Sequence, residues 1–398
     1  MPIISQRGLE MPSSPIRKLA PLADAAKRED VKVYHLNIGQ PDLPTPQKAL
    51  DELKKIDRKT LEYSPSEGFL SLRQKLTGYY RSFGIEVTSD EIIVTTGGSE
   101  AILLCFLACM NPGDEMLAVE PGYANYISFA ITAGIKVKAI TSTIENGFAL
   151  PPIEDFEAAI TPRTRAILLC NPSNPTGYVY SPEELQKIKE LVQKYDLFLF
   201  SDEVYREFVY TDVPYVSAMS LGIPDNVILI DSVSKRYSEC GIRIGMIVTH
   251  NRLVRDTVMK YCQARLSPPL LGQIVAEASI EGTQEYSEAC YAEYKARRDF
   301  FIDGLNRIPG VYTPMPQGAF YTVVSLPVAD AEDFCRWCLS DFRLNGETLM
   351  MAPAAGFYRN PDLGRNQVRM AYVLCIEDLA KALKLLKAAL KAYNKRQV

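Results

Sequence analysis

The sequence predicts an α/β fold: a mostly parallel seven-stranded sheet with helices on both faces, followed by a smaller α+β domain. Seven short apolar runs have the length of strands, and most are separated by amphipathic stretches of helix length. Strands that alternate with helices form parallel sheets, because each crossover returns the chain to the same edge. We expect the strands at residues 91–95, 115–119, 135–140, 166–170, 197–201, 227–231 and 244–249.

Helix-forming stretches fill the segments between these strands. Residues 182–195 are the clearest case, because Ser181 is a capping residue, Pro182 suits the first turn, and acidic residues follow it. We also expect helices at residues 46–55, 70–83, 101–110, 286–305, 331–342 and 376–393, and strands of the second domain at residues 318–324 and 367–373.

The chain is long enough for about two domains. Residues 46–290 are expected to form the large domain that contains the sheet. Residues 1–45 are rich in proline and irregular in pattern, and we assign them to the smaller α+β domain together with residues 291–398. The long charged helix at 286–305 carries the chain from one domain to the other.

The composition limits the classes of partner. The 398 residues are 47% hydrophobic and 23% charged, and the net charge of -4 offers no basic surface for nucleic acid or a membrane. The longest apolar run, residues 101–110, is too short to span a bilayer, and residues 1–20 lack the apolar core of a signal peptide. The nine cysteines are scattered, as expected for reduced thiols, and only two histidines occur. We expect a cytoplasmic protein with small-molecule partners and no metal site.

Lys235 lies just beyond the predicted strand 227–231, whose apolar side chains suit a strand covered on both faces. Ligands of open α/β sheets bind at the carboxyl ends of the strands. A lysine held there can act as an amine nucleophile. A single lysine is more often a solvated surface residue, so the interpretation depends on the residues around it.

A pair of glycines, Gly97 and Gly98, follows the first predicted strand and leads through Ser99 into a helix. Backbone N–H groups at such a helix start can bind a phosphate, with help from the helix dipole and the Ser99 hydroxyl. The pattern is neither a dinucleotide-binding fingerprint nor a P-loop. Glycines at this place can equally make a tight turn.

Polar residues also follow the next predicted strands: Asn174 the fourth, Asp202 and Tyr205 the fifth, and Lys235 the sixth. These strands are about 30 residues apart, the length of one βαβ unit, so the four side chains can share one rim. A buried carboxylate needs a positive partner, and Asp202 has none nearby in the sequence, so a bound cation would satisfy it. Taken singly, Asn174 also suits a turn, Asp202 a helix cap and Tyr205 the core.

Six motifs occur in an order known from one family. Over essentially its whole length the sequence resembles the fold type I pyridoxal-phosphate enzymes, specifically the class I/II aminotransferases of the aspartate aminotransferase type. The motifs are Y-x-x-x-x-G-x-x-x-L-R at 63–73, T-x-G-G-x-x-A at 95–101, N-P-x-N-P-T-G at 171–177, S-D-E-V-Y at 201–205, S-x-S-K-x-Y-x-x-x-G-x-R-x-G at 232–245 and R-x-x-Y at 369–372.

The resemblance implies pyridoxal 5'-phosphate as the cofactor. Lys235 is then expected to bond to the cofactor aldehyde and to move a proton between substrate and cofactor. Asp202 is expected to pair with the ring nitrogen and to share the catalytic role with Lys235 and Tyr205. Other cofactor contacts implied by the family are Asn174 and Tyr205 to the phenolic oxygen, Tyr123 against the ring, and Gly98, Ser99, Glu100, Ser232 and Arg243 to the phosphate.

The resemblance also implies substrate contacts and a homodimer. Arg369 is expected to grip the substrate α-carboxylate, because a guanidinium matches a carboxylate with two parallel hydrogen bonds. Gly39 and Asn174 would complete this contact. Tyr63 is expected to reach the phosphate of a second subunit. The implied reaction is transamination of an amino acid and a 2-oxo acid by a ping-pong mechanism.

Two regions match the family less well. Glu239 and Cys240 stand where family members often carry a small residue or proline, and an acid near a phosphate is unfavourable, so we expect Glu239 to face solvent. Arg265 lies in the general region of an arginine that dicarboxylate-specific relatives use for the distal carboxylate. We therefore expect aspartate as the favoured donor, ahead of aromatic or small neutral amino acids, and 2-oxoglutarate as the acceptor.

Two alternative functions share the fold. A pyridoxal-phosphate-dependent carbon–sulfur β-lyase would use every cofactor residue named above. A non-catalytic regulator usually carries an attached DNA-binding segment, for which the first 45 residues are too short. Such a regulator would also tolerate the loss of Lys235, which is present here.

Overall fold

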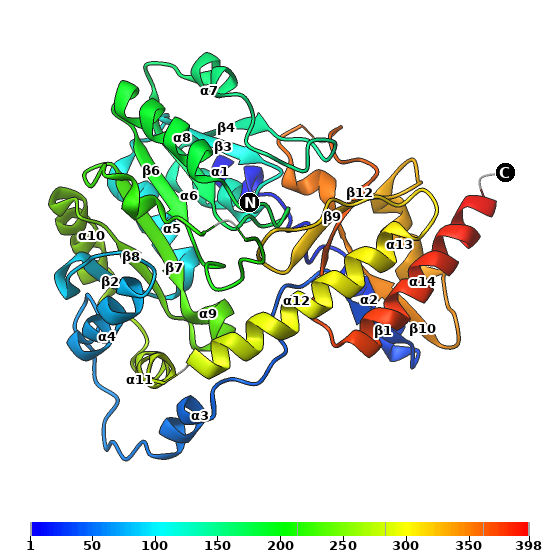
Figure 1. The fold of residues 1–398 in the computed structure, drawn as a ribbon, viewed down its shortest axis with the longest axis horizontal. Coiled ribbons are helices and arrows are strands. Elements are labelled where there is room, and N and C mark those ends of the chain that lie inside the picture. The colour runs from blue at the N-terminus through cyan, green and yellow to red at the C-terminus, as the bar shows by residue number, and fades with distance from the viewer. Residues whose placement is uncertain (1, 213, 283, 361, 397–398) are drawn as a thin grey trace.

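A seven-stranded sheet forms the centre of the large part of the protein (Figure 1). The computed structural model describes residues 2–212, 214–282, 284–360 and 362–396. The strand order is β2-β8-β7-β6-β5-β3-β4, and β8 runs antiparallel to its neighbours β2 and β7 while the other pairs are parallel. The strands are β2 (Ile92–Thr95), β3 (Glu115–Glu120), β4 (Lys136–Thr141), β5 (Thr164–Cys170), β6 (Phe198–Asp202), β7 (Val227–Ser232) and β8 (Gly245–Val248). This confirms the predicted mostly parallel sheet.

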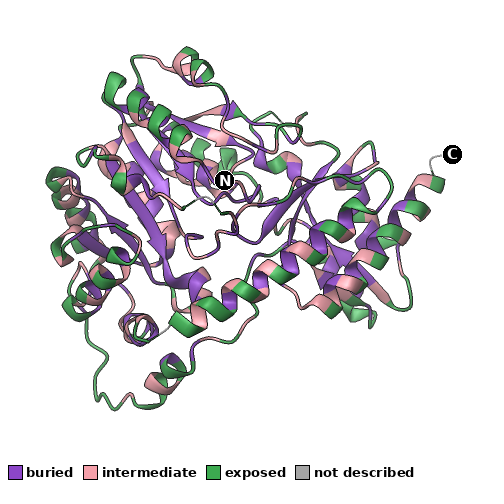
Figure 2. Cartoon of the chain, in the orientation of Figure 1, coloured by how far each residue is buried: buried purple, intermediate pink, exposed green. Residues whose placement is uncertain are grey.

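Helices cover both faces of this sheet. The helices of this part of the protein are α3 (Gln47–Lys54), α4 (Leu70–Arg81), α5 (Gly97–Cys109), α6 (Asn125–Ala133), α7 (Ile153–Ala159), α8 (Pro182–Tyr195), α9 (Val233–Arg236), α10 (Arg252–Arg265) and α11 (Leu270–Ile280). Helix α3 packs against α11 and not on the sheet itself. Successive side chains of a strand point to opposite faces. In β5, Leu168 accordingly packs in one hydrophobic cluster with α5, and Leu169 packs in another with α8. The strands other than the edge strand β4 are therefore buried on both sides (Figure 2).

Helix α8 begins as its sequence predicts. The Ser181 hydroxyl accepts a hydrogen bond from the Glu184 N–H (3.1 Å), and the Glu184 carboxylate accepts one from the Ser181 N–H (2.8 Å). This reciprocal capping satisfies two backbone donors that the helix itself leaves free.

A smaller α+β region follows the long helix α12 (Gln284–Asn306), which runs from the large sheet toward the C-terminal elements (Figure 1). Its three-stranded antiparallel sheet has the order β11-β12-β9, built from β9 (Tyr321–Ser325), β11 (Ala352–Pro353) and β12 (Gln367–Ala371). Helices α13 (Ala331–Ser340) and α14 (Ile376–Lys395) complete it. The exact domain boundaries at residues 46 and 290 stay a prediction.

The N-terminal segment is more regular than its sequence predicts. It contains α1 (Gln6–Glu10), α2 (Ala20–Arg28) and β1 (Lys32–His35), so the prediction of an irregular segment is wrong for these residues. Strand β1 pairs in parallel with β10 (Glu347–Met350), and α2 packs against α13. Both partners lie far along the chain, so local sequence pattern gives no sign of them.

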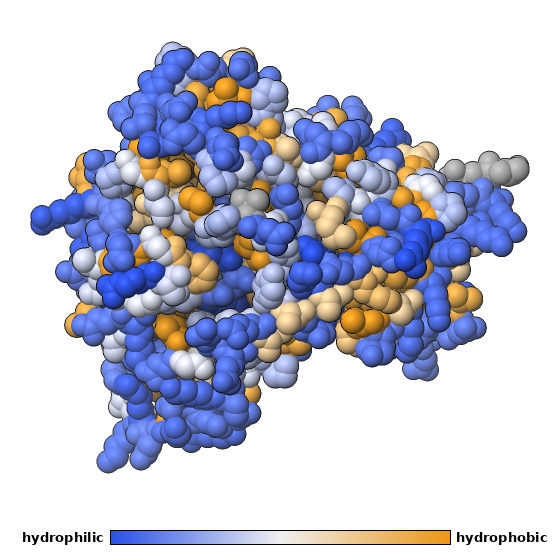
Figure 3. Space-filling model, viewed as in Figure 1, coloured by the Kyte–Doolittle hydropathy of each residue, from blue (hydrophilic) through white to orange (hydrophobic). Residues whose placement is uncertain are grey.

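The molecular face in Figure 3 is mostly hydrophilic, with hydrophobic side chains scattered over it. Within the described residues, none of the helices combines the length and the apolar character needed to cross a bilayer. The cytoplasmic location stays a prediction.

Candidate active site

A cavity of about 700 Å³ lies at the carboxyl ends of β6 and β7. Asp202 and Ser232, the last residues of these two strands, both line it. Tyr321 of β9, Arg369 of β12 and Gly39 of the N-terminal segment line it from the smaller region. Residues from three distant parts of the chain thus meet at the sheet edge where ligands of open α/β folds bind.

Lys235 projects into this cavity from α9, a single helical turn that follows β7 directly. Its Nζ donates a hydrogen bond to the Gly39 carbonyl oxygen (2.9 Å) and lies 3.8 Å from the Cys240 sulfur. Gly39 has to be a glycine, because a Cβ there would lie 1.9 Å from the Tyr321 hydroxyl oxygen. The N-terminal segment can therefore approach the lysine closely.

Asp202 is a buried carboxylate that faces the cavity. Burial raises its pKa to about 6, although hydrogen bonds from the Tyr126 hydroxyl (2.6 Å) and the Val204 N–H (3.4 Å) favour the ionised form. No cationic side chain of the described residues forms an ion pair with it. The acid is thus held in place with room for a positive partner from the cavity.

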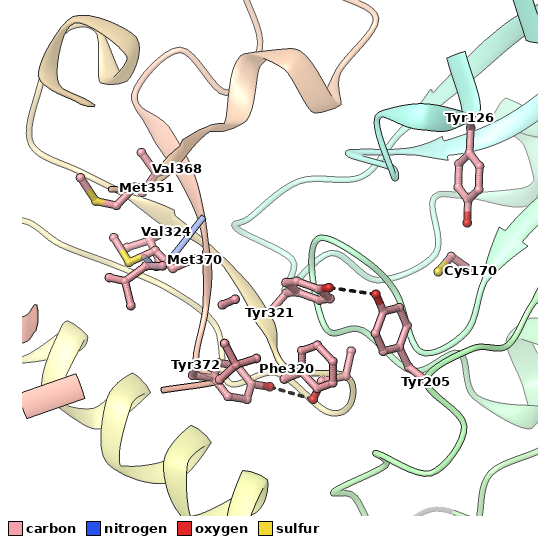
Figure 4. Close-up of a cluster of buried hydrophobic side chains, with 14 of the residues drawn as sticks. Tyr126, Cys170, Tyr205, Phe320, Tyr321, Val324, Met351, Val368, Met370 and Tyr372 are labelled. Carbon is pink, nitrogen blue, oxygen red and sulfur yellow. Dashed lines mark hydrogen bonds between the residues drawn. The ribbon is translucent and has the colours of Figure 1, made fainter. Parts of the chain in front are cut away.

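Tyrosines form one wall of the cavity. Figure 4 shows Tyr205 and Tyr321 joined by a hydrogen bond between their hydroxyls, at 2.9 Å. Tyr123 lies edge-to-face against Tyr126, with ring centroids 5.3 Å apart. Sequence analysis missed Tyr126 and Tyr321. Tyr126 lies three residues after Tyr123, so helical spacing could have indicated it, but Tyr321 comes from another sheet and no local signal marks it.

The start of α5 forms the end of the cavity that suits an anion. Gly98 and Ser99 line the cavity together with Ser232 and Arg243. A Cβ on Gly97 would lie 2.3 Å from the Arg243 guanidinium, and a Cβ on Gly245 would lie 2.5 Å from the Gly98 nitrogen. The glycines of both motifs therefore allow the arginine loop to close over the helix N-terminus, which provides N–H groups and positive charge for a phosphate.

Arg369 is a guanidinium buried without an acidic partner. It is 1% exposed and lines the cavity. It donates hydrogen bonds to the Asn37 carbonyl oxygen and to the Asn174 side-chain oxygen (3.2 Å), but its Nε has no hydrogen-bond partner among the described residues. Burial lowers its pKa from the usual value. No carboxylate within the described parts of the chain pairs with this group, so a ligand carboxylate would satisfy it.

Three of the expected site residues do not line the cavity. The Glu100 carboxylate accepts a hydrogen bond from the Thr96 N–H (2.7 Å) and lies 3.7 Å from Arg265. Arg265 also donates to the carbonyl oxygens of Ser66 and Val94. Tyr63 is 77% exposed. The side chains of Glu100 and Arg265 therefore form an ion pair with each other beside α5, outside the cavity.

Glu239 corrects one prediction, because it is buried and does not face solvent. Its carboxylate accepts a hydrogen bond from Ser279 of α11, and its Oε2 has no hydrogen-bond partner in the part of the chain that the structure describes. Burial raises the pKa of Glu239 to about 7. The physical reason is that α11 packs over the loop that follows α9, so this side chain points into the helix contact instead of water.

The cavity is also lined by Arg17, an exposed residue of the N-terminal segment that sequence analysis did not single out. Within the described chain its guanidinium makes no ion pair. Nothing in the pattern around Arg17 marks it as a site residue.

As for metals, the described residues contain no group of three or more His, Cys, Asp or Glu side chains arranged to hold an ion.

Comparison with known proteins places the chain in a family. The family of class I and II aminotransferases matches residues 31–385. The aspartate aminotransferase of Pyrococcus horikoshii is 29% identical, with 98% of this chain and 97% of that protein covered. Among solved structures, the Thermus thermophilus aspartate aminotransferase with maleate (27% identity) and the Pyrococcus furiosus alanine aminotransferase (29% identity) each superpose with a TM-score of 0.89, over 98% of this chain and 100% of theirs.

The chain therefore belongs to the class I and II aminotransferases. It is an enzyme, a transferase of amino groups that acts on amino acids and oxo acids. Members of this family typically use pyridoxal phosphate.

Proposed function

We propose that this enzyme is a pyridoxal-phosphate-dependent transaminase that moves the amino group of an L-amino acid to a 2-oxo acid by a ping-pong mechanism. The observation that carries the proposal is one cavity lined by the Lys235 amine, the buried acid Asp202 and the buried guanidinium Arg369. In the proposed reaction Lys235 would supply an amine that binds the cofactor and moves a proton, Asp202 an anion for the ring nitrogen, and Arg369 a cation for the substrate carboxylate.

The residues of the cavity fit the cofactor. When bound, pyridoxal phosphate supplies an aldehyde that captures amines and a pyridinium ring that accepts the electron pair left when Cα loses its proton. A protonated ring nitrogen would give Asp202 the positive partner it lacks and would lower its raised pKa. The start of α5, with Ser99 and Arg243, has the N–H groups, hydroxyl and charge that a phosphate requires.

Each protein group then has a stated role. The Lys235 Nζ, which lines the cavity, would accept and release the Cα proton of the substrate and so serve as the general base and acid. The Tyr126 hydroxyl orients Asp202 through their 2.6 Å hydrogen bond. Tyr205, Asn174 and Tyr123 line the same cavity. Tyr205 and Asn174 would donate to the phenolic oxygen of the cofactor, and Tyr123 would pack on its ring.

Arg369 is proposed to bind the substrate α-carboxylate. Its Nε is buried and unpaired, so a carboxylate would add a hydrogen bond to a donor that now has none. Its contact with Asn174 fixes the plane of the guanidinium, and the Tyr321 ring supports it, with 4.7 Å between the guanidinium carbon and the ring centroid.

Arg17 is proposed to bind a second, distal carboxylate, in place of Arg265. Arg265 is engaged with Glu100 beside α5 and does not line the cavity. Arg17 lines the cavity, and its guanidinium has no ion pair with any described residue. Relatives that are named aspartate aminotransferases agree with a dicarboxylic donor. We therefore propose aspartate as the favoured donor and 2-oxoglutarate as the acceptor.

The enzyme is further proposed to be a homodimer. Tyr63 is a large aromatic residue with 77% of its surface exposed, and it lies in the first family motif. Aromatic residues are enriched at protein interfaces. In the proposed dimer Tyr63 reaches the phosphate in the partner subunit, while Gly98, Ser99 and the Glu100 backbone bind it from within the chain.

A half-reaction tests the proposed function. The purified enzyme is loaded with pyridoxal phosphate, mixed with L-aspartate, L-glutamate, L-alanine, L-tyrosine or L-cystathionine in turn, and followed by absorbance and product analysis. We expect aspartate and glutamate to remove the yellow absorbance and to release the matching oxo acid, which 2-oxoglutarate then reverses. If none of the amino acids removes the yellow absorbance, transamination is contradicted. Release of pyruvate and ammonia from cystathionine would identify a β-lyase.

A further inference from the structure

Behind the cavity, four charged residues adjoin the residues that face it. Their side chains are at most 2% exposed and none of the four lines the cavity. Each of them is the sequence neighbour of a residue that lines the cavity. Glu203 follows Asp202, Arg206 follows Tyr205, Asp231 precedes Ser232, and Arg236 follows Lys235. The charged members, Glu203, Arg206, Asp231 and Arg236, are called the buried network below.

The buried network is a continuous chain of alternating charge. Glu203 pairs with Arg206 at 3.1 Å, Arg206 with Asp231 at 3.3 Å, and Asp231 with Arg236 at 3.0 Å. Two acids and two guanidinium groups balance each other, so the interior carries no net charge from them. Because Arg206 follows β6 and Asp231 belongs to β7, the middle contact ties the ends of two neighbouring strands together.

Every carboxylate oxygen of the two acids accepts at least one hydrogen bond. The free oxygen of Glu203 accepts hydrogen bonds from the Ser201 and Ser217 hydroxyls at 2.8 and 2.9 Å. Asp231 accepts from the Tyr80 hydroxyl (2.9 Å) and from the Ser232 N–H (2.7 Å). Buried acids bonded in this way have one allowed orientation, since any rotation would leave a donor or a charge unpaired.

Tyr79 of α4 joins the two guanidinium groups from the other side. Its hydroxyl accepts hydrogen bonds from Arg236 (2.8 Å) and Arg206 (3.3 Å). Its ring also lies under Arg236, with 4.1 Å between the guanidinium carbon and the ring centroid. The arginine next to Lys235 is therefore fixed both by its charge partner and by stacking.

These contacts matter for Lys235 because its helix cannot hold itself in place. Helix α9 has only four residues, and a helix this short has no stability of its own. The position of Lys235 is then set by the tertiary contacts of its neighbours, of which the Asp231–Arg236 pair is the most directional. Buried ion pairs are often no better than apolar packing for stability, so the retained charges fit a role in geometry.

We propose that the buried network is a positioning device that sets the relative geometry of Lys235 and Asp202 within the active site. The proposal rests on the proposed function, in which these two residues serve one cofactor. Glu203 and Arg206 hold the end of β6, Asp231 and Arg236 hold the turn that carries the lysine, and the Arg206–Asp231 contact keeps the two halves in register. Network residues are positioning residues and do not touch the reacting atoms.

The test uses two network variants and a control in the full-length enzyme loaded with pyridoxal phosphate. Asp231→Asn removes the central charge at nearly constant shape, and Arg236→Lys keeps the charge but removes the planar fork. The control is Glu115→Gln, which removes a buried carboxylate from β3 that pairs with Arg163 and Lys138 far from the cavity. The readouts are kcat, KM, cofactor affinity, the pH titration of the cofactor absorbance, and the denaturation midpoint in urea.

We expect each network variant to lower kcat at least about 10-fold, to shift the pH midpoint of the cofactor absorbance, and to leave the KM for the amino acid within about 3-fold. Glu115→Gln should leave kcat and the absorbance titration unchanged, even if its denaturation midpoint falls. If Asp231→Asn does not fold, Arg236→Lys carries the test alone.

Two results would overturn the proposal. One is a folded Arg236→Lys enzyme with the wild-type kcat and the wild-type absorbance titration. The other is an equal loss in Glu115→Gln, which would mean that any buried charge has the same effect. Failure of the proposed function looks different: the wild-type enzyme would then lose no colour with any amino acid, while the cofactor absorbance titration would still show whether the network positions the lysine.

Discussion

Buried charges lie on both sides of the strand ends of β6 and β7, in opposite arrangements. On the cavity side, Asp202 and Arg369 have no oppositely charged partner among the described residues. On the other side, the four members of the buried network pair with one another at 3.0–3.3 Å. Two aspartates that are equally buried differ accordingly. Burial raises the pKa of Asp202 to about 6, whereas Arg236 and Arg206 outweigh burial and hold the pKa of Asp231 below its usual value.

This difference separates two uses of buried charge. An unpaired buried charge costs free energy, and a fold that keeps one at a cavity leaves its partner to be supplied by a ligand. A paired buried charge adds little net stability but fixes geometry. The ends of β6 and β7 therefore have unpaired charged groups on the cavity side and the paired charges of the buried network on the other side.

The largest expected effect comes from removing the amine on the cavity side. Lys235→Ala should lower transamination by roughly 10²–10⁴-fold, because the proton transfer loses its base. The denaturation midpoint of the variant should stay close to the wild-type value, since Lys235 is only partly buried. Steady-state kinetics with aspartate measure the effect, and Lys194→Ala, at an exposed lysine, is the control. More than a tenth of the wild-type rate would contradict the role of Lys235.

Glu239 is a buried acid outside the cavity, and it forms no ion pair with any of the described residues. Its pKa lies at about 7 in the folded protein and near 4.5 when unfolded, so the folded state binds the proton more tightly. The stability that this proton provides is complete below pH 4.5 and is lost as the pH rises through 7. Glu239→Gln should remove this loss and make the protein about 3 kcal/mol more stable than wild type at pH 8.

Urea unfolding at pH 5 and pH 8 measures this difference between the two proteins. Glu115→Gln is the opposite control, because hydrogen bonds from Thr161 and the charges of Arg163 and Lys138 lower the pKa of Glu115 to about 2. Its carboxylate contributes stability above pH 4.5, so this variant should be the less stable one at pH 8. If the stability of the wild-type enzyme changed with pH in the same way as that of Glu239→Gln, the pKa of Glu239 would not be raised by burial.

Arg369→Lys should weaken substrate binding while the fold stays intact. A lysine keeps the charge but cannot offer two parallel hydrogen bonds to a carboxylate. Loss of one hydrogen bond to a charged group corresponds to roughly a 10–100-fold rise in KM for every amino acid, whatever its side chain. KM values for aspartate and alanine measure this effect. A rise for aspartate alone would mean that Arg369 contacts the side chain instead of the α-carboxylate.

The smallest expected effect is at Arg17, an exposed charge at the same cavity. Arg17→Gln should raise the KM for aspartate by a few fold, about the value of an exposed ion pair, and leave the KM for alanine unchanged. Arg265→Gln is the matched variant and should not change the ratio of the two KM values. If Arg265→Gln alone changed that ratio, the role proposed for Arg17 would be wrong.

The sequence predicted the large sheet well because its strands are short apolar runs, most of them separated by amphipathic stretches of helix length, which is a local pattern. It did not predict β1, whose partner β10 lies far along the chain. The predicted lysine, aspartate and arginine all line one cavity. Asp202 and Lys235 were predicted from their places at strand ends, whereas Arg369, in the middle of β12, was predicted only from the family resemblance. Tyr321 and Arg17 were missed because tertiary packing brings them to the cavity, whereas the helical spacing from Tyr123 could have indicated Tyr126.

Glu239 shows a different limit of sequence reasoning. The sequence indicated that an acid should avoid the phosphate region, and the side chain does point away from the cavity. The prediction that the side chain would instead face solvent was wrong, because α11 covers this loop. The buried network was missed for a related reason: Glu203, Arg206, Asp231 and Arg236 look like ordinary surface charges until β6, β7 and α4 are brought together.

The comparison of the two sides is tested most directly by the unfolding free energies of two apo variants, Asp202→Asn and Asp231→Asn, at pH 8. Both replace a buried carboxylate with an amide of the same shape. Asp202→Asn should be more stable than wild type, by up to about 3 kcal/mol, because it relieves an unpaired charge. Asp231→Asn should be less stable by about 3–5 kcal/mol, because it leaves buried guanidinium groups unpaired. Changes of the same sign in both variants would contradict the account.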